Sequence, residues 1–163
     1  MNKRGHVING ALLAIGVGYI LEPSGDVETF ETIATVGLPI VLGAMLPDID
    51  TAFGKHRKTL HNLPLIVALY FWPEWFATMH YVWMGVLTHY VLDVMGSKRG
   101  IALFYPLTDE EFGLPIGVST SSKYADAMTL LVTAIELAAV FAIVHYELPV
   151  QNLSEGASVA IGL

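Results

Sequence analysis

The feature that most constrains the fold is a series of long apolar segments separated by short polar ones. Residues 7–21 and 33–46 are almost continuously apolar, and 76–95 and 125–146 repeat this pattern. A membrane-spanning helix needs about 20 such residues. Hydrophobic residues make up 54% of the 163-residue chain and charged residues only 14%, against about 25% charged in an ordinary soluble domain. The chain is therefore predicted to be all-α, a polytopic helical membrane bundle of four to five hydrophobic helices.

The apolar segments predict spans at about residues 5–22, 27–46, 63–73, 76–95 and 125–146. The third is too short to cross a bilayer alone, so we expect it to be tilted or shielded by its neighbours. In the second span, small residues and a proline indicate close helix packing or a kink, at Gly37, Pro39 and Gly43. An aromatic belt is expected at one end of the fourth span, from Trp72, Trp75, Tyr81 and Trp83.

The basic residues predict the orientation of these spans. They occur at the N-terminus, after the second and fourth spans and just before the fifth, namely Lys3, Arg4, Lys55, Arg57, Lys58, Lys98, Arg99 and Lys123. The segments expected on the opposite side carry acidic residues and no basic ones. Because cytoplasmic loops are enriched in lysine and arginine, we expect a multi-pass protein of the cell membrane with its N-terminus and basic loops in the cytoplasm. The net charge of −7 argues against nucleic acid as a partner.

The segment 46–61, LPDIDTAFGKHRKTLH, holds the densest group of reactive side chains. Asp48 and Asp50 lie two apart after a proline, and His56 and His61 follow within reach of the same point. Carboxylates and imidazoles without thiols are typical ligands of divalent zinc, manganese or iron, and the chain has no cysteine. The alternative is a charged loop whose acids pair with the neighbouring lysines and arginine.

Two further segments bring metal-ligand residues to the same predicted membrane boundary. His89 and Asp93 are four apart, so they share one face of the fourth span, and His6 opens the first. Ionisable groups at such a boundary are costly and usually functional. The candidate metal ligands, expected in loops and helix ends at the cytoplasmic face, are His6, Asp48, Asp50, His56, His61, His89 and Asp93. Taken singly, His89 could instead be a hydrogen-bonded histidine of the bundle, and Asp93 could instead pair with Lys98 or Arg99.

Three other ionisable residues are predicted to lie outside this cluster. His80 falls in the outer half of the fourth span and His145 at the outer end of the fifth. Glu136 falls near the middle of the fifth span. It could serve as a proton-relay or transport residue, or as a structural, hydrogen-bonded glutamate.

The segments GHVINGALLA, GAMLPDID, HRKTLH and GVLTHYVLDVMGSKRGIALFYPL together resemble the YdjM-like family of membrane-bound metal-dependent hydrolases, also described as LexA-binding inner-membrane hydrolases. The resemblance covers about residues 5–107. We expect a single integral-membrane domain, 1–163, in which this region is followed by a loop and last helix at 108–147 and a tail at 148–163. Asn62 stands where serine is usual, and the threonine of the HRKTLH segment is Thr59, with Leu60 before His61. The resemblance implies a His and Asp ligand scheme similar to that of zinc-dependent phospholipase C.

The expected function is hydrolysis of a phosphoester with one or two divalent ions, zinc first and manganese or iron as alternatives. Asp48 or Asp50 is expected to bridge the ions, and Arg57 to bind the phosphate through its planar guanidinium. A membrane lipid or a lipid-linked phosphoester is the expected substrate, because the site lies at the membrane surface. A metal-braced, non-catalytic scaffold is the main alternative. A metal-ion or proton-coupled transporter, with ligands at mid-membrane, and a soluble helical domain are weaker ones.

Overall fold

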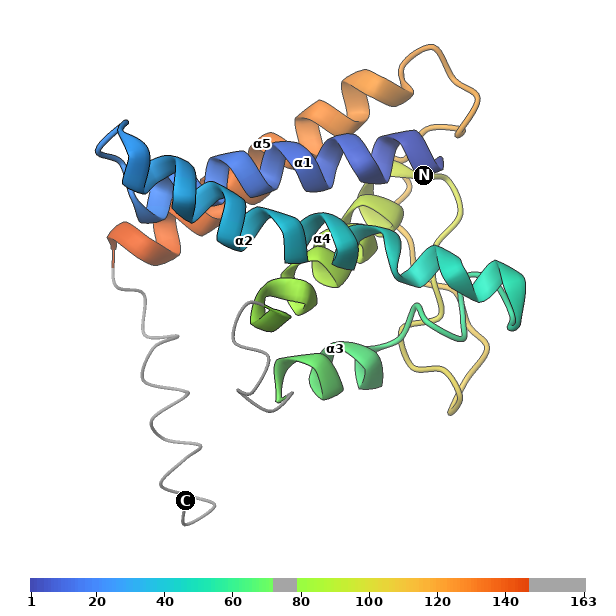
Figure 1. Ribbon diagram of the computed structural model, residues 1–163. Helices are drawn as coiled ribbons and strands as arrows, with labels where there is room; N and C mark the ends of the chain where they lie inside the picture. The colour runs from blue at the N-terminus through green and yellow to red at the C-terminus, as the bar shows by residue number, and fades with distance from the viewer. Residues whose placement is uncertain (72–78, 147–163) are drawn as a thin grey trace.

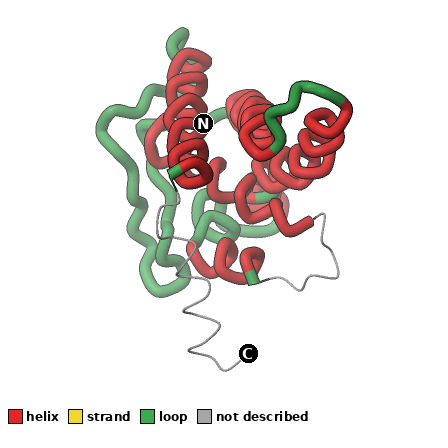
Figure 2. The backbone as a smooth tube through the Cα atoms, turned by 90° about the vertical axis from the view of Figure 1, so that its left-hand side faces the viewer, coloured by secondary structure: helices red, strands yellow, loops and turns green. Residues whose placement is uncertain are grey.

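The computed structural model describes residues 1–71 and 79–146, and the regular elements in these ranges are helices (Figure 2). They are α1 (Lys3–Leu21), α2 (Val27–Met45), the short 3-10 helix η1 (Pro47–Ala52), α3 (Leu63–Tyr70), α4 (Val82–Gly96) and α5 (Ala125–His145) (Figure 1). The prediction of an all-α bundle is thereby confirmed. The predicted tail at 148–163 lies outside the described residues.

Among the described residues, three helices are long and apolar enough to cross a membrane: α1, α2 with its continuation to Ala52, and α5. The predicted fourth span at 76–95 corresponds to α4, which has 15 residues and begins at Val82. Met79–Tyr81 form a 3-10 turn before it, and residues 76–78, with Trp72 and Trp75 of the expected belt, lie outside the described residues. The centrally placed α4 packs against α1, α2, α3 and α5.

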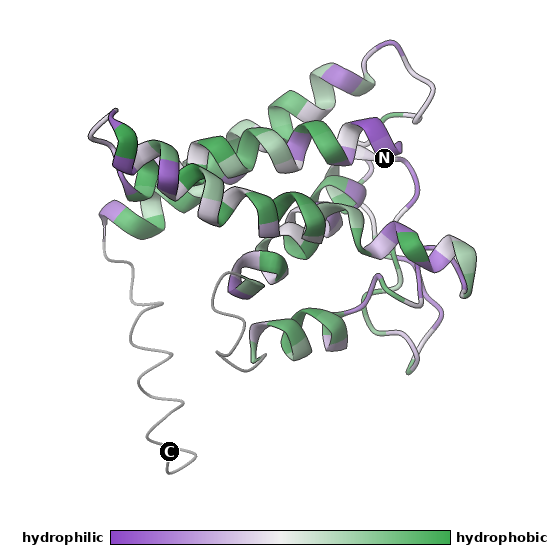
Figure 3. Ribbon diagram, viewed as in Figure 1, coloured by the Kyte–Doolittle hydropathy of each residue, from purple (hydrophilic) through white to green (hydrophobic). Residues whose placement is uncertain are grey.

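The outer surface of the helices is apolar, as expected of a protein solvated by lipid (Figure 3). On α5, Leu130, Leu131 and Ile135 are about half exposed, at 54%, 56% and 46%. A contiguous apolar surface of this kind is unfavourable in water and favourable in a bilayer. Hydrophilic residues gather at the ends of the bundle, which agrees with three spanning helices.

Close packing of α2 on α4 positions the side chains of both helices. A Cβ atom at Gly43 would lie 2.1 Å from the carbonyl oxygen of Val82, and one at Gly85 would lie 2.0 Å from that of Ile40. Only glycine allows the two backbones to approach so closely. The predicted close packing at Gly43 is therefore confirmed, and it brings the end of α2 next to the polar face of α4.

The basic residues lie at one end of the bundle, together with the N-terminus and the long loop between α4 and α5. Ion pairs join these segments across the fold: Arg4 with Asp126 at 3.0 Å, Lys58 with Asp109 at 3.0 Å and Arg99 with Glu111 at 2.6 Å. The structure thus brings together the segments that the distribution of lysine and arginine predicts to lie on the same side of the membrane. Which side of the membrane this end occupies remains a prediction.

A polar triad joins α1, α4 and α5 within the bundle. Asn9 donates to Glu136 at 2.9 Å, and the Thr88 hydroxyl contacts Glu136 at 2.7 Å and also Asn9. These three contacts close a ring. The asparagine amide supplies one proton to the ring and the threonine hydroxyl supplies another, so the third contact needs a proton from the Glu136 carboxyl. The ring of hydrogen bonds is complete when Glu136 is protonated, which supports a structural role for this residue.

Candidate metal centre

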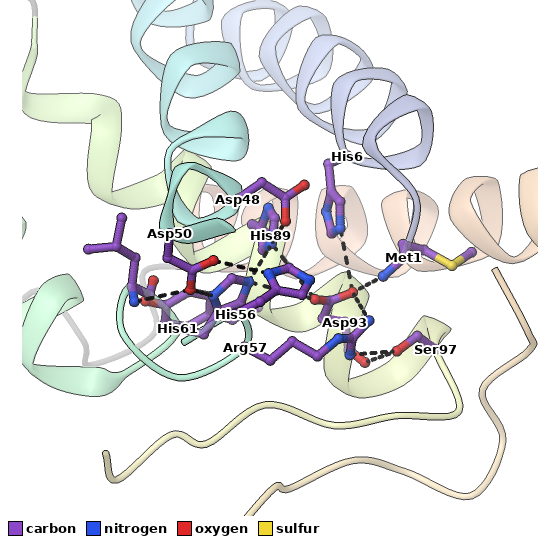
Figure 4. A network of polar contacts seen from close by, with 12 residues as sticks. Met1, His6, Asp48, Asp50, His56, Arg57, His61, His89, Asp93 and Ser97 are labelled. Atoms are coloured by element: carbon purple, nitrogen blue, oxygen red, sulfur yellow. Dashed lines mark hydrogen bonds and ion pairs between the residues drawn. The ribbon is translucent and has the colours of Figure 1, made fainter. Parts of the chain in front are cut away.

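The structure gathers the seven predicted ligand residues at the end of the bundle that carries the basic loops (Figure 4). They come from four segments: α1, η1, the loop that follows η1, and α4. Two groups of three residues have ligand atoms within 4.8 Å of one another, His6 with His89 and Asp93, and Asp48 with His56 and His61. The seventh, Asp50, contacts the second group through hydrogen bonds.

Asp50 holds two histidines in place. Pro47 begins η1, whose tight turn leaves the Asp50 carboxylate fully buried. One carboxylate oxygen lies 3.0 Å from Nδ1 of His56 and the other 3.0 Å from Nδ1 of His61. A carboxylate that accepts from Nδ1 fixes the ring orientation and leaves Nε2 available as a ligand. These contacts favour an orienting role for Asp50 over the expected bridging role.

His61 is fixed further by its surroundings. The Tyr90 hydroxyl donates to the backbone carbonyl of Leu60 at 2.7 Å and accepts from the backbone N–H of Asn62 at 2.9 Å, so it clamps the chain on both sides of the histidine. Burial lowers the pKa of His61 to about 4. The imidazole is therefore neutral near pH 7, the form that binds metals.

His89 is oriented by the α2–α4 packing. Its Nδ1 lies 2.7 Å from the backbone carbonyl oxygen of Ala44, at the end of α2. Because a carbonyl can only accept, Nδ1 of His89 carries the proton and its Nε2 carries a lone pair. That Nε2 lies 3.1 Å from Nε2 of His61. The Nδ1 proton of His61 is directed to Asp50, so no proton remains between the two Nε2 atoms, and two lone pairs face each other.

Asp93 faces histidines with both of its oxygens. Its Oδ1 lies 3.4 Å from Nε2 of His6, and its Oδ2 lies 3.9 Å from Nε2 of His61 and 3.8 Å from Nε2 of His89. The amino group of Met1 also contacts Oδ1. Asp93 therefore has the arrangement of a carboxylate that can join two groups of ligands.

His6 has no hydrogen-bond partner among the described residues for either ring nitrogen, although its side chain is only 2% exposed. Its ring stacks on that of His89, with centroids 3.6 Å apart. A buried polar atom without a partner is costly. An orphaned imidazole beside a carboxylate and a second imidazole has the surroundings of a metal ligand.

The spacing of the donor atoms fits a divalent ion. Zinc binds nitrogen and oxygen at about 2.0–2.2 Å in tetrahedral sites, which places its ligand atoms about 3.3–3.6 Å apart. His61, His89 and Asp93 present three such atoms at 3.1, 3.8 and 3.9 Å from one another. Asp48 adds an oxygen 3.8 Å from Nε2 of His89. The residues present therefore suit the ion that the sequence predicts.

Arg57 lies beside this cluster with its side chain buried. One guanidinium nitrogen donates to the carbonyl oxygens of Arg99 at 2.5 Å and Gly100 at 3.1 Å, and to the Ser97 hydroxyl at 3.3 Å. The other lies 3.8 Å from Oδ1 of Asp93. The residue has a φ of +67°, which is uncommon for a side chain other than glycine. Arg57 thus anchors the segment after α4 and places positive charge next to the candidate ligands.

The ion pairs at this end of the bundle argue against a simple charged loop. Lys58 pairs with Asp109 and Arg99 with Glu111, so these two basic residues are engaged by the loop after α4. Asp93 is therefore not paired with Arg99, which was the alternative to a metal-binding role for this residue. Asp48 and Asp50 face histidines instead.

His80 and His145 lie apart from the cluster. His80 contacts Tyr70 and Tyr81, and His145 stacks on Phe141. Sequence reasoning missed Tyr90 and Ser97. The signal for Tyr90 was its position next to His89, because a tyrosine hydroxyl inside an apolar helix requires a polar partner.

Fold and cluster together define a helical integral-membrane protein with a buried His and Asp cluster at one end of its bundle. The chain belongs to the YdjM inner membrane protein family, which it matches over residues 1–151. The match includes the loop after α4 and the last helix, beyond the segments 5–107 that carry the resemblance in sequence. Comparison with curated proteins and with solved structures finds no match.

Proposed function

We propose that this protein is a metal-dependent phosphoesterase that acts on a lipid or lipid-linked substrate at the cytoplasmic face of the membrane. One observation carries the proposal: Nε2 of His61 and Nε2 of His89 face each other at 3.1 Å with no proton available between them. A cation bound at this point satisfies both lone pairs. Zinc suits the donor set best, with manganese and iron as alternatives.

The ligand roles follow from the contacts of each side chain. His6, His61, His89, Asp48 and Asp93 present ligand atoms, and the partly exposed His56 completes the group around Asp48. Asp50 orients His56 and His61 through its two oxygens. Asp93, with oxygens directed to separate histidines, is the best candidate to join two ions. This assignment replaces Asp48 or Asp50 as the bridging residue.

A divalent ion held by these residues would lower the pKa of a bound water and stabilise charge on a leaving oxygen. Arg57 holds positive charge 3.8 Å from Asp93, where it offsets the charge of a phosphate. Its other guanidinium nitrogen is bound to backbone carbonyls, so it contributes mainly as a fixed charge. The Asp48 side chain is 16% exposed, so it lies at the edge of the cluster.

The test is hydrolysis of lipid phosphoesters in mixed micelles with added Zn²⁺ or Mn²⁺, measured as phosphate or headgroup release. Wild type should release product, and Asp93→Asn and His89→Ala should reduce the rate to background. His145→Ala is the matched control, because it removes a histidine outside the cluster. Metal-loaded wild type that is inactive on a broad panel of lipid phosphates would favour the metal-braced scaffold.

A further inference from the structure

A cavity of about 200 Å³ lies between the start of α1 and the junction of α2 with η1. Its floor includes His6 and Asp48, two of the candidate metal ligands. His6 is almost completely buried, and its ring nitrogens have no partner among the described residues. The cavity therefore reaches two of the candidate metal ligands between the start of α1 and the junction of α2 with η1.

The rim of this cavity is apolar and exposed. Val7 on α1, Met45 at the end of α2 and Ile49 on η1 line it, with exposed fractions of 38%, 48% and 54%. Both α1 and the continuous α2–η1 segment are long and apolar enough to span the membrane. Side chains of this kind are suited to contact with acyl chains. The apolar part of the rim is thus suited to contact with lipid.

Lys3 adds a positive charge to this lining. It is exposed in the first turn of α1, where the partial positive charge of the helix N-terminus also favours an anion. Its neighbour Arg4 pairs with Asp126 of α5 at 3.0 Å. The two adjacent basic residues therefore differ in what they contact, and only Lys3 lines the cavity.

We propose that the cavity admits the phosphate of an anionic membrane lipid directly from the bilayer, with Lys3 holding the phosphate at the mouth and its chains remaining among the lipids. The proposal rests on the proposed function and specifies its substrate as lipid-borne. A volume of about 200 Å³ is below the roughly 300–1,000 Å³ of pockets that enclose a drug-sized ligand. It suffices for a phosphate group and excludes a whole lipid.

The kinetic test compares Lys3→Glu with Arg4→Glu in protein reconstituted with detergent and lipid. For dioleoyl phosphatidic acid in mixed micelles, Lys3→Glu should raise KM about tenfold and leave kcat unchanged, a loss of about 1.4 kcal/mol in binding. Arg4→Glu should change KM less than twofold. For soluble p-nitrophenyl phosphate, Lys3→Glu should raise KM less than it does for the lipid, because this substrate can also approach from water past the partly exposed His56; Arg4→Glu should leave it unchanged. Equal effects of Lys3→Glu on both substrates, or no effect on either, would overturn the proposal.

A binding measurement separates this proposal from the proposed function. Native mass spectrometry of the purified protein with dioleoyl phosphatidic acid should show one retained lipid, and the same measurement with dioleoyl phosphatidylcholine should show less. Lys3→Glu should remove this preference and Arg4→Glu should keep it. Retention with no turnover would refute the hydrolase and leave the lipid site standing. Turnover without a Lys3-dependent preference for phosphatidic acid would refute the lipid site and leave the hydrolase standing.

Discussion

His61 and His89 face each other through their Nε2 atoms at 3.1 Å, although they lie 28 positions apart, His61 in the loop before α3 and His89 on α4. The partner of each Nδ1 atom determines this arrangement. Asp50 accepts from His61, and the carbonyl of Ala44 accepts from His89. Two neutral rings so arranged repel each other unless a cation lies between them, which connects the local geometry to metal binding.

Asp50 should act on metal affinity through the two histidines that it orients. We expect Asp50→Asn to weaken Zn²⁺ binding about 10–100-fold, as loss of an outer-shell partner typically does, because an amide oxygen replaces only one of two carboxylate acceptors. Competition with a chromogenic chelator measures this affinity. The control is Asp109→Asn, an exposed carboxylate paired with Lys58, which should leave affinity unchanged. An unaltered affinity in Asp50→Asn would show that the orienting contacts do not matter.

Arg57 combines buried hydrogen bonds with a backbone conformation that favours glycine, and the two effects can be separated. Arg57→Ala should lower the free energy of unfolding by about 1.5–3 kcal/mol, since it removes donors to the carbonyls of Arg99 and Gly100. Arg57→Gly loses the same bonds but accepts a φ of +67°, so it should be about 1 kcal/mol more stable than Arg57→Ala. Chemical unfolding in detergent micelles measures both. A glycine variant less stable than the alanine variant contradicts this account.

Glu136 should be replaceable by glutamine. The ring formed with Asn9 and Thr88 needs a proton from residue 136, and a glutamine amide supplies one in the same place. Glu136→Gln should therefore unfold within about 0.5 kcal/mol of wild type. Glu136→Ala leaves the buried Asn9 amide N–H without its acceptor and removes one of the two contacts of the Thr88 hydroxyl, so it should cost about 1–3 kcal/mol. If glutamine destabilises as much as alanine does, the carboxyl group is ionised in the native protein.

The membrane orientation can be tested with two conservative substitutions, because the chain has no cysteine. Ser121, between α4 and α5, and Ser24, between α1 and α2, are both exposed and lie at opposite ends of the bundle. A membrane-impermeant maleimide applied to intact cells should label Ser24→Cys and spare Ser121→Cys, since basic loops face the cytoplasm. Labelling of both cysteines from outside is incompatible with the predicted topology.

The apolar runs and the spacing of the acids and histidines made much of the fold predictable. His89 and Asp93 lie one helical turn apart, so their shared face followed from helix geometry. The orientation of the His61 and His89 rings could not be predicted. The His61 ring is oriented by Asp50. The His89 ring is oriented by the carbonyl of Ala44, which comes close to His89 only because glycines let α2 pack tightly on α4. The start of α4 was missed because Met79–Tyr81, which continue the pattern of the predicted span, form a 3-10 turn in place of α-helix.

The central claim, that the His and Asp cluster binds a divalent ion, is tested most directly by the metal content of the purified protein. Elemental analysis after purification without chelators should find one to two equivalents of a divalent metal per chain in wild type. The same analysis should find strongly reduced content in His61→Ala. The control His80→Ala, which removes a histidine outside the cluster, should match wild type. Wild type without bound metal after incubation with Zn²⁺, Mn²⁺ or Fe²⁺, or equal content in all three proteins, would contradict the claim.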